Sequence, residues 1–369
     1  MALFSVTVRR VRDILPHPNA DVLELAVIEG YQTVVRKGVF TPGDLVAYIP
    51  EAAVLPDPVL ETLGMKDSGL LSGRLKNRVK AIRLRGALSQ GICYPVQPTW
   101  VEGQEVQELL GIVKYIPPVP SCLEGQVEVL GVEHALHFDV DNYQMFPDVL
   151  QTGEEVVFTE KIHGTFSVFG LINMFNSDAL NAGYWRPICA SKRIFAQGLT
   201  YKDCHENDEN IYMRAFRYLK VPEKIRLVIQ DEDGFYGSVY IMGETYGVQD
   251  LKYGANQYRD ETLGFRVFDI FVGAPSEGRY LNDQELERIC QRMGLPRVPV
   301  LYRGPYSKEV QDLYTEGLET VSGKALHMRE GIVMAPVVER RDDKLGRVKL
   351  KSVSAQYLLR KGKDATEFD

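Results

Sequence analysis

One short segment constrains this chain more than any other. Residues 159–165 read Thr-Glu-Lys-Ile-His-Gly-Thr, after a β-branched and aromatic run at 155–158 and before an alternating apolar and small run at 166–170. This pattern predicts a strand, a tight turn and a second strand, with Lys161 at the mouth of the turn. Gly164 in that turn would let the backbone approach a phosphate group closely.

Lys161 is therefore a candidate nucleophile. A lysine amine attacks a phosphorus atom only when it is neutral, and the ordinary lysine pKa of about 10.4 leaves little neutral amine at pH 7. Nearby cations or burial would have to favour the neutral form. Taken alone, the segment is more typical of a surface lysine in a hairpin, so the rest of the chain has to decide between the two interpretations.

Four further segments follow in order along the chain. A Gly-Glu pair follows the strand predicted at 238–242, an aromatic strand contains Phe-Asp-Ile, a Glu-Gly pair opens another strand, and two lysines alternate on one strand face. Their central residues are Glu244, Phe268, Glu330, and the pair Lys349 and Lys351. Each segment alone is typical of an ordinary strand, with Phe268 in the core and the lysines on a solvated face. The ordered set favours a shared function.

These residue types suit phosphoryl transfer, which needs positioning and charge neutralisation more than covalent chemistry. Two lysines and an arginine around a phosphate would supply positive charge and help to keep Lys161 neutral. Glu330 could hold a magnesium ion through water, and Phe268 could offer the face of its ring to a purine.

Composition narrows the class of protein. The chain has 369 residues with 45% hydrophobic and 25% charged residues, which is typical of soluble globular domains. No apolar run approaches the length of a membrane span, and the N-terminus lacks a signal core, so no membrane partner is expected. The five cysteines form no Cys-x-x-Cys pair, which indicates a reducing, cytoplasmic location without a disulfide framework or structural zinc.

The net charge of −7 is unevenly distributed, because residues 1–100 carry twelve Lys/Arg against nine Asp/Glu. An acidic total does not exclude nucleic-acid binding, since phosphate is recognised by local patches.

The turn signals divide the chain into two parts. Residues 1–110 are strand-rich and predict a small closed β-barrel of the OB type, a fold that commonly binds nucleic acid. Residues 111–124 form a proline-rich linker. Residues 125–369 mix strands and helices without regular βαβ alternation, so the overall fold class is α+β. Within this part, Asn282 to Glu285 resemble a capping box that opens a helix ending near Gly294.

With these motifs in hand, the chain resembles the covalent nucleotidyltransferase superfamily, and within it the ATP-dependent RNA ligases with an N-terminal OB domain, the nick-sealing type found in Deinococcus and Naegleria. The resemblance covers nearly the whole chain and includes residues 16–21, Pro-His-Pro-Asn-Ala-Asp, and 83–91, Arg-Leu-Arg-Gly-Ala-Leu-Ser-Gln-Gly. It implies a second domain of antiparallel sheets flanked by helices, an ATP-grasp-like adenylyltransferase.

The resemblance also implies an activity. Such an enzyme joins 3′-hydroxyl and 5′-phosphate ends through a lysyl-AMP and an AMP-capped 5′ end, with ATP as the AMP donor and Mg²⁺ or Mn²⁺ as the metal. Its partner would be RNA or an RNA/DNA duplex with a break, and a monomer is expected. Whether the natural break is RNA–RNA, RNA–DNA or a cut tRNA stays open.

The resemblance assigns roles residue by residue. Lys161 is the nucleophile, Lys349 and Lys351 contact the α-phosphate, and Glu330 is associated with the metal. The residues implied to bind the nucleotide are Glu160, His163, Gly164, Arg193, Glu244 and Phe268.

Two features distinguish this chain from its relatives. Phe166 occupies a position, five residues after the nucleophile, where many relatives carry Asn or Arg, so Ser167 is a candidate to make the ribose or phosphate contact. The sequence continues for only eighteen residues after Lys351, where DNA ligases and capping enzymes carry an OB domain. We therefore favour a ligase over a GTP-dependent capping-type transferase. The intact lysines and Glu330 argue against a degenerate nucleic-acid-binding module.

A basic stripe in the N-terminal part is a candidate nucleic-acid contact. Arg74, Lys76, Arg78 and Lys80 recur at every second position. On a strand this spacing would place all four on one face, where they could follow a nucleic-acid backbone. A solvated strand face is the alternative.

Overall fold

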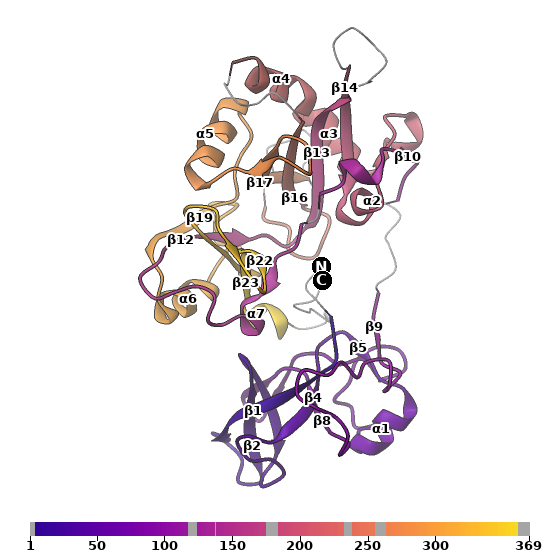
Figure 1. Ribbon diagram of the computed structural model, residues 1–369, viewed down its shortest axis with the longest axis vertical. Helices are drawn as coiled ribbons and strands as arrows, with labels where there is room; N and C mark the ends of the chain where they lie inside the picture. Colours follow the sequence, from indigo (N-terminus) through magenta and orange to yellow (C-terminus); the bar gives the residue numbers. More distant parts are fainter. Residues whose placement is uncertain are drawn as a thin grey trace. The chain divides into compact units, whose positions relative to one another are not determined.

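The computed structural model describes residues 4–116, 124–136, 138–174, 184–231, 238–254 and 263–360. The chain forms two compact units (Figure 1). The first contains Met1–Pro117, Asp139–Gln151 and Lys349–Asp369, and the second contains Pro118–Phe138 and Thr152–Val348. The domain limits expected from the sequence stay a prediction, and residues 117–123 of the expected linker lie outside the described residues.

The first unit contains the OB-like barrel that the sequence predicts. Its main sheet has the strand order β3-β2-β1-β4-β8. The long strand β1 pairs with β4 through its first half and with β2 through its second half, with an irregularity between Val11 and Asp13. A bulge of this kind lets one strand turn a corner and serve both sides of a curled sheet. The strands are β1 Thr7–Pro16, β2 Leu23–Ile28, β3 Tyr31–Arg36, β4 Leu45–Ile49 and β8 Ile92–Pro95.

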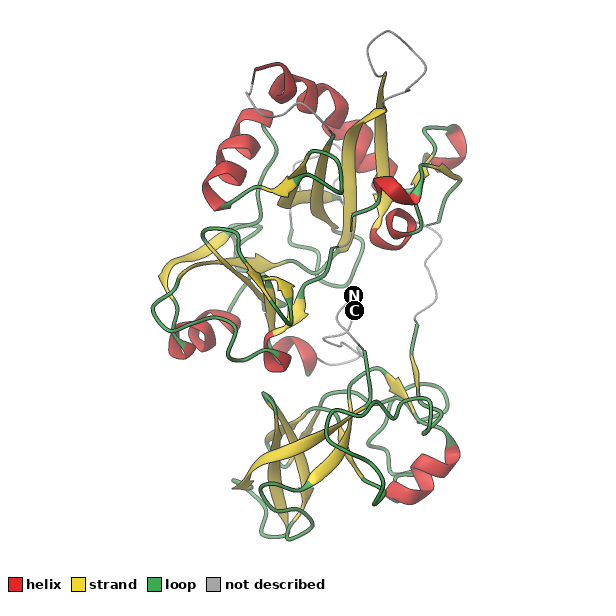
Figure 2. Cartoon of the chain, in the orientation of Figure 1, coloured by secondary structure: helices red, strands yellow, loops and turns green. Residues whose placement is uncertain are grey.

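Short elements complete this unit, and among them the helix α1 lies beside the barrel strands (Figure 2). They are β5 Ala53–Val54, α1 Asp57–Leu63, β6 Ile82–Leu84, β7 Ala87–Ser89, β9 Val113–Lys114, β11 Asp141–Asn142, the 3₁₀ helix η3 Tyr143–Met145, β23 Leu350–Val353 and α7 Ala355–Leu358. Strand β5 pairs with β9, β6 with β7, and β11 in parallel with β23. Apolar side chains from opposite sides of β4, including Val46 and Ile49, enter two separate buried clusters.

The second unit is built on antiparallel sheets. One sheet has the order β14-β13-β16-β17-β18, and in another the strand β12 lies between β19 and β20. These strands are β12 Glu155–Lys161, β13 Thr165–Met174, β14 Tyr184–Ser191, β16 Val239–Tyr246, β17 Gly264–Val272, β18 Arg279–Tyr280, β19 Val300–Pro305 and β20 Gly331–Pro336.

Helices cover one face of the sheet that contains β13, β16 and β17. Alternate residues of its strands, such as Phe169, Ile241 and Phe265, pack with Ile211, Phe216 and Leu286 of the helices in one buried cluster (Figure 1). Because successive side chains of a strand point to opposite faces, the residues between these core positions lie on the face away from the helices. The helices of this unit are α2 Lys192–Ala196, α3 Ile211–Leu219, α4 Val221–Asp231, α5 Asp283–Met293 and α6 Lys308–Thr315. Of these, α6 contacts β20 of the other sheet.

The remaining elements of this unit are short, and one cap confirms a sequence prediction. They are β10 Val127–Val129, η2 Val132–His134, β15 Leu199–Tyr201, η4 His205–Asn207, β21 Arg341–Asp342 and β22 Gly346–Arg347. Helix α5 begins at the predicted capping box between Asn282 and Glu285 and ends at Gly294 in the left-handed conformation. Within the described ranges, no helix has the length and apolar character needed to cross a membrane.

Candidate active site

Lys161 is the last residue of β12, and its partner across the sheet is Gly331, the first residue of β20. Glu330 directly precedes that glycine, so the antiparallel register brings the lysine and the glutamate to the same strand end. Lys161 Nζ donates a hydrogen bond to Glu330 Oε1, and the two side chains are 23% and 8% exposed. This ion pair favours the protonated amine, which must lose its proton before it can attack.

The strands on either side of the turn do not pair with each other. Strand β12 pairs with β19 and β20, whereas β13 pairs with β14 and β16. The predicted strand, turn and strand are confirmed, but the turn carries the chain from one sheet to another. Lys161 therefore lies where the two sheets adjoin, and the alternative of a surface hairpin does not describe this site.

Gly164 allows a close approach between the turn and β16. A Cβ atom at this position would lie 2.4 Å from the carbonyl oxygen of Thr245 and 2.7 Å from Cγ of Glu244. Only glycine fits against the neighbouring strand at these distances. Glu244 lies within β16, which continues beyond residue 242, where the sequence analysis ended the strand. The lysine turn and Glu244 are thus held together by backbone contact.

Glu244 is the most perturbed carboxyl group near Lys161. Burial raises its pKa, Lys161 lowers it and the nearby Glu330 raises it, and the net pKa is about 8. A pKa near 8 keeps a large share of this carboxyl neutral at pH 7. In that form it can donate a hydrogen bond as well as accept one.

His163 is held by two residues that the sequence analysis did not identify. Its Nε2 lies 2.8 Å from Asp250 Oδ1, and its backbone N–H donates to the hydroxyl of Tyr253 at 2.6 Å. Its Nδ1 lies 3.9 Å from Glu330 Oε2. Asp250 and Tyr253 come from the loop after β16. No motif in the chain points to them, because they reach His163 only through the tertiary fold.

Glu160 has a different environment from its neighbour Lys161. Successive side chains of a strand point to opposite faces. The Glu160 carboxylate is 1% exposed, and its Oε2 accepts hydrogen bonds from the backbone N–H and the hydroxyl of Thr320, at 2.8 and 2.6 Å. Burial raises the pKa of this carboxyl, and the Thr320 hydrogen bonds oppose that shift. The carboxylate thus fixes the segment around Thr320 against β12.

Three phenylalanines gather on the face of the β13–β16–β17 sheet that the helices leave open. The ring centroids of Phe166 and Phe268 are 5.3 Å apart, and Phe138 lies 5.2 and 5.5 Å from them. The register between β16 and β17 shifts at Met242 and Gly243, which pair with Asp269 and Val267. Phe268, between those two partners, is therefore an extra residue in β17. Such a bulge re-aims side chains. Phe268 is therefore half-buried in an aromatic group outside the helix-covered core.

Lys192, next to the predicted Arg193, lies near this aromatic group. Both open helix α2 after the cap residue Ser191. The Nζ of Lys192 lies 5.8 Å from the centroid of the Phe166 ring, and its charge lowers the pKa of Glu244. Arg193 is exposed. Lys192 is thus a candidate site residue, although the sequence motif points to its neighbour Arg193.

Asp269, next to Phe268, anchors a buried arginine. It is 1% exposed and accepts two hydrogen bonds from Arg347, at 2.5 and 3.0 Å. The same guanidinium donates to Glu339 at 2.8 and 2.6 Å and lies 3.6 Å from the ring centroid of Tyr280. These carboxylates hold the pKa of Arg347 above its ordinary value despite burial. A planar guanidinium suits both the bidentate pairs and the stacking.

The lysine pair lies in the final segment of the first compact unit. Lys351 belongs to β23, where it is the register partner of Asn142, and Lys349 directly precedes this strand. They are 4% and 9% exposed. Their predicted contact with the α-phosphate stays a prediction.

The expected strand with Arg74, Lys76, Arg78 and Lys80 on one face is wrong. Ser72 and Arg78 form an isolated antiparallel bridge, and the residues between them turn, with φ of 83° at Gly73 and 51° at Lys76. Arg78 is half-buried, with its guanidinium 4.0 Å from the ring centroid of Tyr115 and its Nε donating to Ser72 Oγ at 3.1 Å. Period-two spacing does not distinguish a strand from a tight turn of this length. Arg74 and Lys76 remain exposed at its tip.

A divalent metal would find one strong protein ligand near Lys161. In the described ranges no group of three or more His, Cys, Asp or Glu side chains forms a metal cage. Glu330 offers a carboxylate beside the amine, so any ion held there would take its other ligands from water and phosphate oxygens. This is how magnesium commonly binds in nucleotide sites, and Glu330 fits that role.

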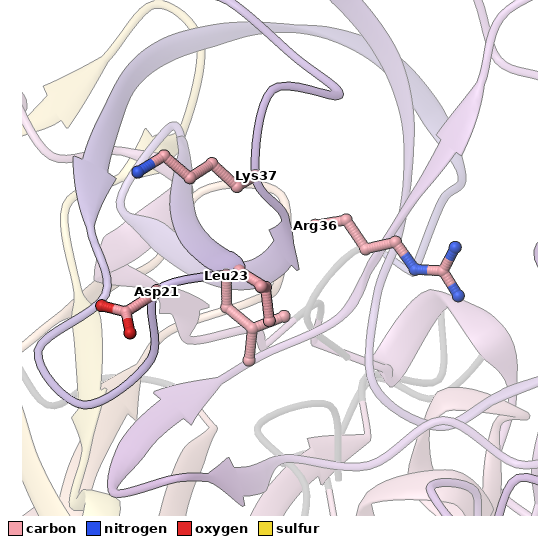
Figure 3. A pocket seen from close by; sticks show the side chains of 5 residues that line it. Asp21, Leu23, Arg36 and Lys37 are labelled. Atoms are coloured by element: carbon pink, nitrogen blue, oxygen red, sulfur yellow. The ribbon is translucent and has the colours of Figure 1, made fainter.

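An open pocket on the first unit contains none of the predicted catalytic residues. It is lined by Asp21, Val22, Leu23, Arg36 and Lys37. Figure 3 shows the ends of the Arg36 and Lys37 side chains pointing in opposite directions from the strand end, with Asp21 on the lysine side. Its cations diverge and an acidic residue lines the same pocket, so we do not assign the chemistry to this pocket.

Comparison with known proteins agrees with the architecture. A family model described as RNA ligase matches residues 154–353, and a model described as an OB-fold domain matches residues 5–96. No curated protein matches the chain.

Solved structures with a similar fold include several of Naegleria gruberi RNA ligase. Its complex with pyrophosphate has a TM-score of 0.75 at 20% identity, covering 97% of this chain and 98% of that chain. A mutant of the same ligase with ATP and Mn has a TM-score of 0.73 at 19% identity, covering 96% of this chain and 98% of that chain. A mutant with AMP and Mn has 0.74 at 19% identity, with the same coverage. At such identities the likeness establishes the fold.

Proposed function

The chain belongs to the RNA ligase family, and we propose that it is an ATP-dependent enzyme that joins 3′-hydroxyl and 5′-phosphate ends through a lysyl-AMP intermediate. The observation that carries the proposal is the grouping of Lys161 with Glu330, Glu244 and His163. These residues come from three separate sequence motifs, and they meet at one strand end. The similar structures with ATP, AMP and Mn support a nucleotide and a divalent metal as ligands.

In the first step, Lys161 Nζ attacks the α-phosphorus of ATP. The nitrogen–phosphorus bond forms as the bond from the α-phosphorus to the bridging oxygen breaks, and pyrophosphate leaves. The attacking amine must first lose a proton, and its hydrogen-bond acceptor in the resting enzyme is Glu330. Lys192, 5.8 Å from the Phe166 ring, and the predicted contacts of Lys349 and Lys351 would supply positive charge for the phosphates.

The purine would stack against the aromatic group at Phe268, which is half-buried rather than sealed in the core. Glu244, with its raised pKa, can hydrogen-bond to a ribose hydroxyl as donor or acceptor. We retain Gly164, His163, Glu160 and Arg193 as nucleotide-binding residues. Glu160 would bind the nucleotide through its backbone, because its carboxylate accepts two hydrogen bonds from Thr320.

In the second and third steps, the AMP passes from the lysine to a 5′-phosphate, and a 3′-hydroxyl attacks that phosphate and expels AMP. We propose that the substrate is a nick in an RNA-containing duplex, gripped by the OB-fold domain. Glu330 would hold Mg²⁺ or Mn²⁺, which neutralises phosphate charge when bound. We further propose a monomer that works in the cytoplasm during RNA repair. Cysteine usage supports a reducing compartment.

The test is covalent labelling. Wild-type protein incubated with α-labelled ATP and Mg²⁺ or Mn²⁺ should retain label after denaturation, whereas Lys161→Ala and Lys161→Arg should not. A guanidinium stays protonated and cannot attack, so the arginine variant separates charge from nucleophilicity. Label from GTP alone would indicate a capping-type transferase, and no label from either would indicate a binding module. Retained label in either Lys161 variant would show that another residue is the nucleophile.

A further inference from the structure

A two-residue hairpin in the OB-fold domain presents two arginines at its tip. Strands β6 and β7 pair through Leu84 and Ala87, which leaves Arg85 and Gly86 as the turn. Both turn residues have positive φ, 44° and 93°. Turns of this type strongly favour Asn-Gly, because the first residue must adopt a left-handed conformation. An arginine there is unfavourable for the turn itself, which indicates that its side chain serves another purpose.

The hairpin is fixed to the loop at residues 16–21. Asn19 donates its side-chain amide to the carbonyl of Arg85 at 3.0 Å. The backbone N–H of Asn19 donates to His17 Nδ1 at 3.1 Å, so the His17 proton lies on Nε2, which donates to the carbonyl of Leu84 at 3.1 Å. A Cβ atom at Gly86 would lie 2.9 Å from the Asn19 amide nitrogen, so the contact is close.

The other strand of the hairpin is fixed to β3. The amide of Gln32 donates to the carbonyl of Leu88 at 2.8 Å, the backbone N–H of Val34 donates to Ser89 Oγ at 3.0 Å, and Thr33 donates to the carbonyl of Gln90 at 2.6 Å. Side chains from two segments, the loop at residues 16–21 and β3, therefore hold this hairpin through its backbone. Such fixation lowers the entropy lost when its tip binds a ligand.

Within the described part of the chain, the guanidinium groups of Arg83 and Arg85 make no hydrogen bond or ion pair, and both residues are exposed. Two other cations of the same unit provide a contrast, because they are paired: Arg10 with Glu102 at 2.5 Å, and Lys66 with Glu61 and Asp57 at 3.4 and 3.7 Å. Arg83 and Arg85 lie two residues apart on the hairpin, with Leu84 between them bound to His17. Their charge is available to an external anion.

We propose that the tip of the β6–β7 hairpin, through Arg83 and Arg85, binds consecutive phosphates of the polynucleotide substrate. The proposal rests on the proposed ligase function and assigns a place on the OB-fold domain where the strand is held. Guanidinium groups match phosphate oxygens with paired N–H donors, and a pre-fixed backbone holds them in register. His17 and Asn19 act as positioning residues, because they bind the hairpin backbone.

The experiment measures binding of the full-length protein to a nicked RNA–DNA duplex over a range of salt concentrations. Arg83→Gln/Arg85→Gln should weaken binding on the order of tenfold and reduce the slope of log K against log salt by about one to two, since each duplex phosphate contact contributes about 0.9. Arg83→Lys/Arg85→Lys keeps the charge and should retain most of the slope. Arg10→Gln/Lys66→Gln removes the same charge at paired positions and should leave binding near wild type.

Equal binding by the glutamine variant and the wild type would overturn the proposal, and so would an equal loss in the Arg10 and Lys66 control. Circular dichroism checks the folding of each variant. The rate of labelling by ATP checks the proposed nucleotide site, to which the hairpin contributes no residue. If the wild type takes no label, the proposed function fails, while the salt slopes still report on the hairpin surface. Loss of label only in the hairpin variant would assign Arg83 and Arg85 to adenylylation rather than to the polynucleotide.

Discussion

Substituting Gly164 by alanine tests whether the contact between the lysine turn and β16 positions the reacting group. The added Cβ would lie 2.4 Å from the carbonyl oxygen of Thr245 and 2.7 Å from Cγ of Glu244. Ordinary contacts of this kind begin near 3.4 Å, so the turn must move by about 1 Å. The Thr245 carbonyl belongs to a strand that pairs on both sides, with β13 and with β17. The turn, rather than the strand, must therefore yield.

Two effects follow from this displacement. Overpacking of a well-packed region costs about 1–3 kcal/mol of stability. Misplacing a reacting group by about 1 Å costs on the order of a hundredfold in rate. Gly164→Ala should therefore slow formation of the lysyl-AMP adduct by about that factor, while the melting temperature falls by only a few degrees.

Gly170→Ala is the matched control. A Cβ there would lie 2.6 Å from the carbonyl oxygen of Val239, which is also on β16. Gly170 lies within β13, nine residues after Lys161 in the chain. It should lower stability by a similar amount and leave the rate of adduct formation per folded molecule near wild type. The assay follows α-labelled ATP incorporation at early times, with the folded fraction measured by circular dichroism. A wild-type rate in Gly164→Ala, or an equal rate loss in both variants, would refute the reasoning.

Three further predictions follow. Glu244 has a folded pKa of about 8 against an ordinary 4.5, so its contribution to stability is full below pH 4.5 and is lost as the pH rises through 8. In urea titrations, the unfolding free energy of the wild type relative to Glu244→Gln should therefore fall between pH 5 and 8, by up to about 1.4 kcal/mol per unit; a flat difference would disprove the assignment. Asp269→Ala removes one partner of the buried ion pair with Arg347 and should lower the free energy of unfolding by about 3 kcal/mol. Glu102→Ala, at the exposed pair with Arg10, should lower it by under about 1 kcal/mol in the same urea titrations, and similar losses in the two variants would contradict this account. Phe268→Leu should raise the KM for ATP about tenfold in the labelling assay, since base stacking on an aromatic ring is worth about 1–3 kcal/mol, and an unchanged KM would remove Phe268 from the nucleotide site.

Local rules were enough for several features of this protein. The strands around Lys161, the strand that starts after Glu330 and the capped helix α5 were all predicted, because each depends on side-chain alternation, glycine placement or a cap within a few residues. The order of the motifs also indicated the family, since that order does not depend on the three-dimensional structure.

Tertiary structure decided which groups meet. Lys161 contacts Glu330 because the register of β12 with β20 aligns them, and no local pattern encodes a register across 169 positions. The bulge that re-aims Phe268 depends on how β17 pairs with β16, and Asp250 reaches His163 only through the fold. Of the alternating basic residues, Arg74 and Lys76 lie in a turn with positive φ at Gly73 and Lys76, and Arg78 closes this turn and stacks on Tyr115, so the four do not share one strand face. Charge spacing along a chain therefore indicates a binding surface only after the backbone path is known.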